Sequence, residues 1–373
     1  MKNRIRSKAL KFCQIAGLPV LEPFVRLAAG EDAREQLREI AKFTIVPILS
    51  VVLFIGLWSV AASRIKTDSA QLPSPTATWT AARELWDAHH QQRQADAIRR
   101  EEERQQAVYY VVQALRAEQQ AETANGQQRA TLLANADLLR KQAMQTANFT
   151  STSAPTFIDQ TVRSIGTVFV GFLIATLVAV PLGILCGMSP VFNAAVSPII
   201  QLFKPVSPLA WLPIASIVIL WWYSGSNPEN ALFSRAFLIS ATTVSLCSLW
   251  PTLVNTALGV ASVNPDYLNV AKVLRLSWWQ TLTKIILPAS LPMMFAGLRI
   301  SLGVGWMVLI AADMLAQNPG LGKFVWDMFQ NGSNSTYAKI TVAVLVIGFV
   351  GLVLDRLMVC LKNLVSFDNG ATV

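Results

Sequence analysis

The chain has 373 residues, of which 53% are hydrophobic and 14% are charged, and its mean hydropathy is +0.43. A soluble globular protein carries roughly a quarter charged residues. Several uncharged runs here reach the about 20 residues that cross a bilayer, so the composition indicates an all-α polytopic membrane protein. The net charge of +9 fits the basic cytoplasmic ends of membrane helices better than nucleic-acid binding.

The first 42 residues are basic and hold nine of the Lys and Arg residues. This segment is too long and too interrupted for the n-region of a signal peptide. We expect it to lie on the cytoplasmic membrane surface, near anionic lipid. The uncharged run at residues 43–62 predicts the first transmembrane helix. Because basic residues collect on the cytoplasmic side, the N-terminus is expected there.

Residues 63–156 differ in composition and are expected outside the cytoplasm. Pro73 and Pro75 predict a start without helix, and a stretch rich in Ala, Gln, Arg and Glu follows from residue 81 to 147. Asn125-Gly126 is its one turn signal, so we predict a hairpin of two helices of about 44 and 20 residues. No heptad repeat is sustained along it. The hairpin is either an inert insertion or a docking surface for an external partner.

Residues 157–365 are predicted to form the main membrane core, with spans at residues 165–188, 207–223 and 236–257 in its first half. Pro205, Pro208 and Pro213 each remove a backbone donor, so the start of the middle span is predicted not to be a regular helix. Irregular backbone at membrane depth is tolerated only beside protein or a water-filled cavity. This span is therefore a candidate pathway element, with a kinked packing helix as the alternative. Its candidate residues are Ser207, Pro208, Trp211 and Ser216.

Two more spans are predicted at residues 291–312 and 340–361, before a cytoplasmic tail at residues 366–373. Arg299 lies inside the fifth span. An intramembrane arginine is costly and marks a functional site, a buried partner, or a side chain that extends to the interface. We count Arg299 as a further candidate pathway residue.

The stretch at residues 264–292 is the one well-charged break in the second half of the chain. Pro265 and Asp266 suit the start of a helix. Apolar residues then recur at helical spacing, at Leu268, Ala271, Leu274, Trp278, Leu282 and Ile285. The pattern predicts a short amphipathic helix and a second one that ends at Pro288. An ordinary basic loop between two spans is the alternative.

No motif for enzyme chemistry occurs in the chain. The run Gly320-Leu321-Gly322-Lys323 is too short for a phosphate-binding loop and lacks its hydroxyl residue. There is no serine elbow, zinc-binding helix or pair of carboxylates at catalytic spacing. We therefore expect no catalytic site, no metal and no cofactor in this polypeptide.

The stretch at residues 264–292 resembles the signature loop of binding-protein-dependent ABC importer permeases, whose pattern is E-A-A, three residues, G, nine residues, I-x-L-P. The residues of this chain at the pattern's positions are Asn269, Val270, Ala271, Arg275, Ile285, Leu287 and Pro288. Asn269 and Val270 replace the glutamate and the first alanine, and Arg275 replaces the glycine. The resemblance implies that this loop docks into a groove on an ATPase subunit.

The segments LPSPTATW, NPDYLNVAKVL and GVGWMVLIAADM look like the nitrate/sulfonate/taurine branch of these permeases, and most like nitrate permeases. The resemblance covers residues 40–80 and 157–365 and leaves out the hairpin. It implies a type I ABC importer permease core of about six transmembrane helices in a bacterial inner membrane. The implied partners are ATPase subunits, a periplasmic or lipid-anchored substrate-binding protein, a second permease copy and membrane lipid, but not nucleic acid.

The expected substrate is nitrate, with nitrite, bicarbonate and cyanate as close alternatives and a sulfonate such as taurine as a further one. Two other classes of function stay open. One is a membrane-anchored scaffold that acts through the hairpin. The other is a secondary transporter that works alone, for which internal repeats are expected and none is found.

Overall fold

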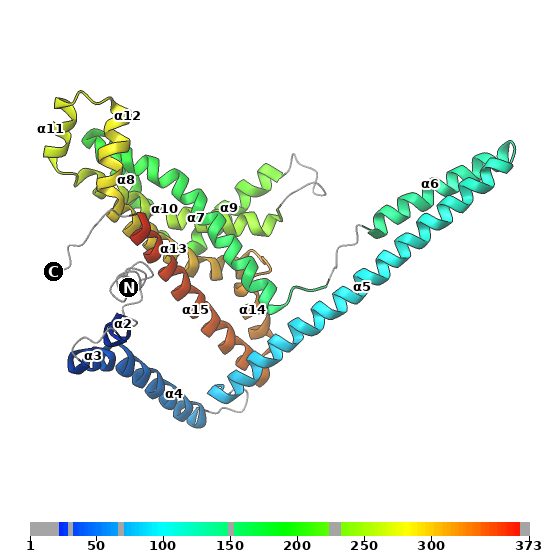
Figure 1. Ribbon diagram of the computed structural model, residues 1–373, viewed down its shortest axis with the longest axis horizontal. Helices are drawn as coiled ribbons and strands as arrows, with labels where there is room; N and C mark the ends of the chain where they lie inside the picture. The colour runs from blue at the N-terminus through cyan, green and yellow to red at the C-terminus, as the bar shows by residue number, and fades with distance from the viewer. Residues whose placement is uncertain (1–21, 29–32, 66–70, 148–152, 224–232, 366–373) are drawn as a thin grey trace. The chain divides into compact units, whose positions relative to one another are not determined.

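The computed structural model describes residues 22–28, 33–65, 71–147, 153–223 and 233–365 (Figure 1). Within these ranges the regular elements are helices, so the predicted all-α fold is confirmed. The chain divides into a membrane unit of residues 1–81 and 160–373 and a hairpin unit of residues 82–159. Predictions for residues 1–21 and for the tail at 366–373 fall outside the described residues.

Five helical runs of the described chain are long and apolar enough to cross a membrane. They are Arg34–Arg64, Phe157–Met188, Arg235–Ala261, Trp278–Leu315 and Asn334–Val365. The number becomes six if Pro190–Phe203 and Pro208–Tyr223, which are bent by 105° relative to each other, form one broken span. The prediction of about six spans is therefore confirmed.

The first run consists of α3 (Ala33–Ile40), a π-helical turn η2 (Ala41–Ile45) and α4 (Val46–Arg64), and α2 (Glu22–Ala28) precedes it. Nearly all the large apolar side chains of α4 are exposed. This suits a helix that faces lipid, because lipid tails solvate such side chains as well as a protein core does. The indole nitrogen of Trp58 donates to the carbonyl of Pro73 at 3.0 Å and so ties Pro73 to α4.

The hairpin consists of α5 (Pro75–Thr123) and α6 (Gln127–Ala147), which run side by side from a turn at Gly126 (Figure 1). Their 49 and 21 residues confirm the predicted pair of helices. The predicted start without helix at Pro75 is wrong. Proline fits the first position of a helix, where its fixed φ is already helical and no N–H is needed.

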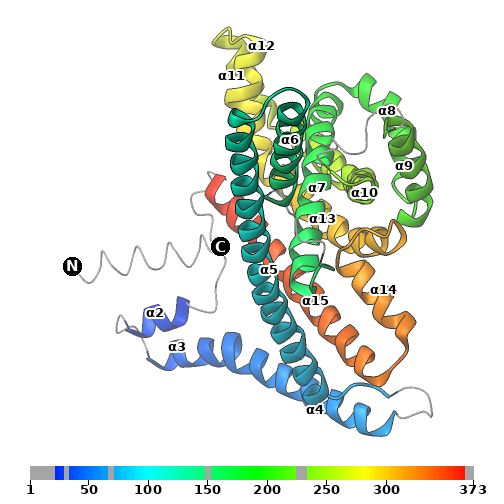
Figure 2. The same ribbon diagram turned by 90° about the vertical axis from the view of Figure 1, so that its right-hand side faces the viewer.

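The helix α10 (Arg235–Ala261) packs against α7 (Phe157–Met188), α9 (Pro208–Tyr223) and α13 (Leu287–Leu315), as Figure 2 shows. Five small residues on α7 recur every four positions and form one stripe: Gly171, Ala175, Ala179, Gly183 and Gly187. A Cβ atom at Gly183 would lie 2.7 Å from Cβ of Thr256 on α10. Small residues thus let the two backbones approach closely, as is common between membrane helices.

Hydroxyl groups join α10 to α13 across a buried interface. Ser301 donates to the carbonyl of Ser248 at 2.5 Å and accepts from the Thr252 hydroxyl at 2.7 Å and the Thr252 N–H at 3.0 Å. All three residues are buried. The N–H bond matters because Thr252 follows Pro251, where the regular helical bonding of α10 is disturbed.

The helices α8 (Pro190–Phe203) and α9 meet at a break that contains Pro205. The prediction that the proline-rich span starts irregularly is wrong, because α9 is a regular helix from Pro208 onward. Pro208 occupies the first position, where no donor is missed. Pro213 lies inside the helix and removes only one internal bond. The irregular backbone therefore lies before α9, at residues 204–207.

The fifth and sixth predicted spans correspond to α13 and α15 (Asn334–Val365), with the short α14 (Leu321–Asn331) between them. The guanidinium of Arg299 on α13 donates to both carboxylate oxygens of Asp355 on α15, one of them at 2.8 Å from Nη2. The indole nitrogen of Trp306 donates to the carbonyl of Ile347 at 2.9 Å, which joins the same two helices.

Candidate functional site

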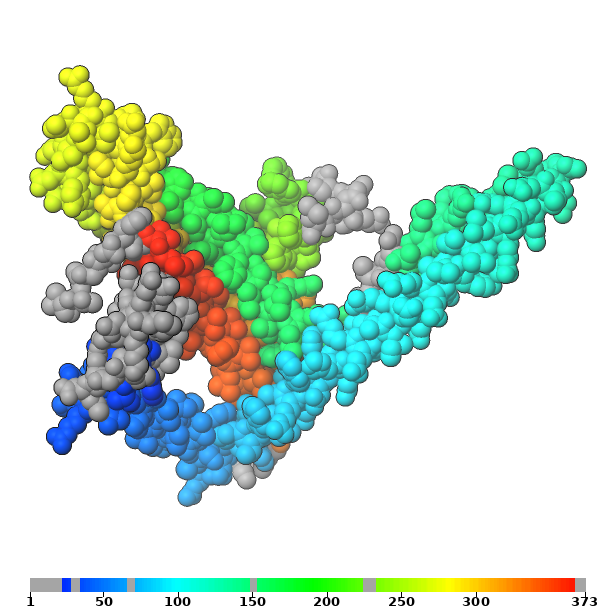
Figure 3. All heavy atoms as spheres, viewed as in Figure 1, coloured from blue at the N-terminus to red at the C-terminus, as the bar shows by residue number. Residues whose placement is uncertain are grey.

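The stretch at residues 264–292 forms α11 (Pro265–Val273), α12 (Trp278–Thr281) and a π-helical turn η4 (Leu282–Ile286). Figure 3 shows it in yellow as a lobe at one end of the membrane unit. The side chain of Asn264 caps α11 by accepting from the N–H of Asp266 at 2.9 Å. Ser277 and Gln280 form a reciprocal capping box that starts α12. The predicted pair of short helices is confirmed, except for the end of the second.

The prediction that Pro288 ends the second helix is wrong. α12 continues through η4 into α13, and Pro288 is the second residue of α13. The wider π turn just before it shifts the backbone bonding, and near the start of a helical segment the missing N–H of proline costs little. The loop therefore joins the fifth span without a break.

Arg275 has a left-handed backbone conformation, with φ of +49°. Its N–H donates to the carbonyl of Lys272 at 3.0 Å, and the N–H of Leu276 donates to that of Ala271 at 3.0 Å. This pair of bonds is a Schellman motif, which ends a helix and favours glycine at the left-handed position. Arg275 thus stands where the backbone requires the conformation that glycine adopts without steric cost.

Replacing Arg275 with glycine is expected to stabilise the protein slightly, because a left-handed conformation costs a non-glycine residue about 1–2 kcal/mol and the flexibility of glycine in the unfolded chain offsets about 0.4–1 kcal/mol of that gain. Thermal unfolding of the purified variant in detergent measures the effect. Arg275→Ala, which keeps the strain and removes the charge, is the matched control and should not stabilise. A lower stability for Arg275→Gly than for Arg275→Ala would contradict the argument.

The helix α11 has a buried side and an exposed apolar side. Ala271 is buried and Leu268 is half-buried against a cluster of Val260, Val263, Leu282 and Ile286. The opposite side presents apolar residues to the surroundings: Tyr267, Val270, Val273 and Leu274. Val273 is 82% exposed. Such a contiguous apolar face on a loop outside the membrane helices is typical of a surface that another protein covers.

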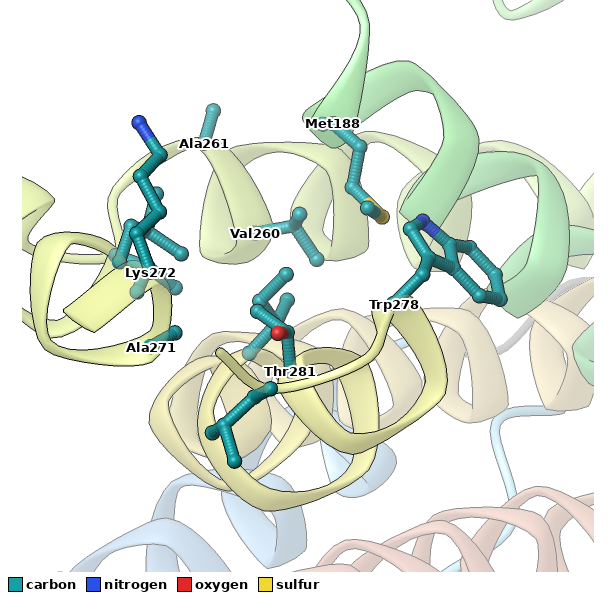
Figure 4. Close-up of a pocket in the computed structure, with 12 residues that line it drawn as sticks. Met188, Val260, Ala261, Ala271, Lys272, Trp278 and Thr281 are labelled. Carbon is teal, nitrogen blue, oxygen red and sulfur yellow. The ribbon is translucent and has the colours of Figure 1, made fainter. Parts of the chain in front are cut away.

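A pocket of about 380 Å³ lies behind α11, between the loop and the ends of α7 and α10. Figure 4 shows Val260 and Thr281 facing each other across it, with Lys272 and Trp278 at its two sides. Its lining is mostly apolar. The hollow leaves α11 supported mainly through Leu268 and Ala271. Sparse packing of this kind lowers the free energy of moving a segment locally.

The predicted loop residues fall into two groups. Ile285 and Leu287 pack against the same inner cluster as Leu268, and Ala271 is buried nearby. Asn269, Val270, Arg275 and Pro288 are exposed. The residues that match the family pattern thus mostly support the loop from within, and those that depart from it lie mostly on its surface.

The predicted pathway residues on α9 are close together in the fold, whereas Arg299 lies on another helix. Pro208 is the first residue of α9, and the preceding Ser207 accepts from the N–H groups of Ala210 and Trp211 through its carbonyl. The hydroxyl of Ser216 donates to the carbonyl of Leu212 at 2.8 Å. Arg299 is ion-paired with Asp355 on α15, with side chains 51% and 36% exposed, and its place in the pathway stays a prediction.

Trp211 is 9% exposed, and within the described part of the chain its indole N–H meets no acceptor. The same holds for the buried indole N–H of Trp250 on α10. The ring of Phe203 links the two, with ring centroids 5.4 Å from Trp211 and 6.1 Å from Trp250. An unsatisfied buried donor costs about 1–3 kcal/mol. Two buried indole N–H groups of one aromatic cluster thus have no acceptor among the described residues.

Sequence reasoning missed a buried polar cluster at the other end of α13. Asp313 is fully buried and accepts from the hydroxyl of Ser164 on α7 and from the side-chain amide of Asn318, each at 2.7 Å. Ser164 in turn accepts from the N–H of Leu321 at 2.8 Å. The cluster thereby fastens the turn between α13 and α14 to α7. In the sequence, the only sign of this cluster is a single acidic residue, Asp313, at the end of the predicted fifth span.

The second half of the chain is similar to a known family of membrane proteins. A family model described as the binding-protein-dependent transport system inner membrane component matches residues 179–366. The match starts within α7, includes the loop of α11 and α12, and extends to the end of α15.

Three relatives have named transport roles. The nitrate import permease protein NrtB of Synechococcus elongatus is 36% identical over 207 residues, which are 56% of this chain and 69% of that protein. The bicarbonate transport system permease protein CmpB of Synechocystis sp. is 39% identical over 208 residues, 56% and 68% of the two chains. The taurine transport system permease protein TauC of Escherichia coli is 34% identical over 174 residues, 45% and 58% of the two chains. This chain belongs to the family of inner-membrane components of binding-protein-dependent transport systems.

Proposed function

We propose that this ABC importer permease carries nitrate or a chemically similar small oxyanion such as nitrite, bicarbonate or cyanate. The observation that carries the proposal is the identity of 36% to a nitrate permease and 39% to a bicarbonate permease over most of the membrane unit. A sulfonate such as taurine is the second candidate, because a taurine permease is 34% identical over a shorter stretch.

The proposed assembly has two copies of this chain, each with the loop of α11 and α12 on an ATPase subunit. ATP is hydrolysed by those subunits, and a substrate-binding protein delivers the anion to the opposite face. In this arrangement the N-terminus and the loop face the cytoplasm. The exposed apolar side of α11, with Val270 and Val273, supports the assignment because it is suited to a groove on another protein.

The coupling step in this proposal follows from the path of the chain. Closure of the ATPase subunits displaces α11 and α12, and α12 continues into α13. A shift of the loop is thereby delivered directly to a membrane span. The sparse support behind α11 lets it move without first breaking a tightly packed interface. ATP acts here as a ligand that favours one of two arrangements of the membrane helices.

The substrate is tested by expressing the chain with its ATPase and binding protein in cells that lack their own uptake systems. We expect labelled nitrate to accumulate and labelled taurine not to. Bicarbonate uptake without nitrate uptake would show that bicarbonate, and not nitrate, is the substrate. Taurine uptake alone would contradict the oxyanion proposal and support the second candidate.

Trp211→Phe is expected to lower the maximal rate of nitrate uptake by roughly tenfold, because a hydrogen bond to an ion contributes about 1.5–3 kcal/mol. An aromatic ring beside Phe203 remains in this variant, although it is smaller than indole. Trp222→Phe on the same helix is the matched control, since Trp222 is 70% exposed. Equal rates in the two variants would exclude the indole of Trp211 as a donor to the anion.

Arg275→Glu is expected to weaken assembly with the ATPase subunits or to uncouple ATP hydrolysis from uptake. The substitution keeps the strained backbone and reverses one exposed charge, so a change relative to Arg275→Gln isolates the charge. The readouts are co-purification of the ATPase and the ratio of ATP hydrolysed to anion imported. Normal coupling in both variants would show that Arg275 does not face the ATPase.

A further inference from the structure

An apolar stripe on α5 lies outside the packed seam of the hairpin. It consists of Val108, Val111, Val112 and Leu115, which are 58%, 44%, 39% and 49% exposed. Their spacing of three and four residues places them on one face of the helix. The stripe is therefore a second apolar surface on α5, besides the side that packs against α6.

The seam between α5 and α6 uses a different face. Ala114 and Ala117 of α5 are buried there against Ala136 and Leu139 of α6, and Ala107 and Ala121 of α5 are also buried. Small residues bring the two helices close together and leave no room for the larger side chains of the stripe. The hairpin thus completes its own core without covering Val108 or Leu115.

The charge of the hairpin unit argues against a strongly charged partner. Residues 82–159 contain ten Asp and Glu against nine Lys and Arg. The balance gives little long-range attraction to an acidic or a basic surface. The helix α5 is also not apolar enough to enter a membrane, since it lies outside the candidate spans found in the described chain.

The stripe is complementary to itself. Arg104 lies one turn before Val108 on the same face, and Glu122 lies two turns after Leu115. The face therefore runs from a base through apolar residues to an acid. Arg104 has a weak ion pair at 3.8 Å with Glu101 of its own helix, and its guanidinium has five donors.

We propose that the stripe is a contact between the hairpins of two copies of this chain. The α5 helices pack antiparallel, with Val108 opposite Leu115 of the second copy and Val111 opposite its Val112. In that register Arg104 lies about 4.5 Å along the axis from Glu122 of the second copy, within reach of its side chain. The contact requires two copies in one membrane, as in the proposed assembly, and is independent of the anion carried.

The contact is tested by cross-linking the full chain in membranes, in a background with all four cysteines changed to alanine. Val112→Cys is treated with a short bis-maleimide, and two differently tagged copies identify a dimer. We expect at least fivefold more dimer than for Gln106→Cys. Gln106 is exposed on the same helix, half a turn round from Leu115, so it controls for chance encounters.

A charge exchange separates a second copy from any other partner. In the Val112→Cys background, Arg104→Glu should lower the dimer yield severalfold, and adding Glu122→Arg should restore it. Restoration is expected only if the two residues meet across copies of this chain. Equal yields at Val112→Cys and Gln106→Cys, a product with a different protein, or no restoration would each overturn the proposal. Nitrate uptake by the same cells is an independent readout of the proposed function.

Discussion

Gly183→Ala is expected to destabilise the membrane unit by about 1–3 kcal/mol or more, because it overpacks the contact of α7 with α10. The added Cβ would lie 2.7 Å from Cβ of Thr256 and 2.8 Å from the carbonyl oxygen of Leu253. The oxygen belongs to a helical backbone, so relief requires the two helices to separate. Size-exclusion chromatography of heated detergent extracts measures the fraction that stays folded.

Gly166→Ala is the matched control for this prediction. Gly166 lies on the same helix, and a Cβ there would meet nothing within 4 Å. Alanine is the better helix former, so this variant should be as stable as the original or more so. Similar losses at Gly166 and Gly183 would show that a general effect of the substitution, and not the close approach of α10, is responsible.

Asp313→Ala is expected to lower the stability of the same unit by about 2–6 kcal/mol, because the Ser164 hydroxyl and the Asn318 amide both lose a buried acceptor and each loss costs about 1–3 kcal/mol. Asp313→Asn keeps one acceptor oxygen and should lose about half as much. Thermal unfolding of the purified variants measures the effect. We expect the unfolding temperature to be lowest for Asp313→Ala, higher for Asp313→Asn and highest for the original protein.

Asp327→Ala supplies the comparison for Asp313. Asp327 is on the neighbouring α14 and pairs with Lys323 at 3.1 Å, with side chains 41% and 30% exposed. An ion pair of this kind contributes about 0–1 kcal/mol. If Asp327→Ala were as damaging as Asp313→Ala, the loss would arise from the charge of the region and not from the buried cluster.

The features that the sequence predicts well are those set by local pattern. Asn125-Gly126 predicts the hairpin turn, because glycine adopts the positive φ found at Gly126. Uncharged runs predict the spans. The apolar spacing from Leu268 predicts the two short helices of the loop, and the structure shows that the first ends before the left-handed backbone of Arg275.

The features that the sequence does not predict depend on contacts between distant segments. Arg299 has several interpretations until α15 places Asp355 beside it. The burial of Asp313 follows from the approach of Ser164, 149 positions away. The three errors with proline have one cause, since Pro288 is likewise the second residue of α13. Pro75 and Pro208 begin helices, and the position of a proline within a helix, not its presence, decides what it costs.

The unbroken path from α12 through η4 into α13 has a mechanical consequence for the membrane unit. The helix from Trp278 to Leu315 has 38 residues, a length of about 57 Å at 1.5 Å per residue. One end carries the two exposed tryptophans of α12, and the other carries Asp313. Gly297, close to α10, lies between the two ends. A tilt of about 5° about Gly297 shifts the two ends in opposite directions by about 2.5 Å each. In the proposed assembly, such a tilt would pass a displacement of α12 to the end of α13 that carries Asp313.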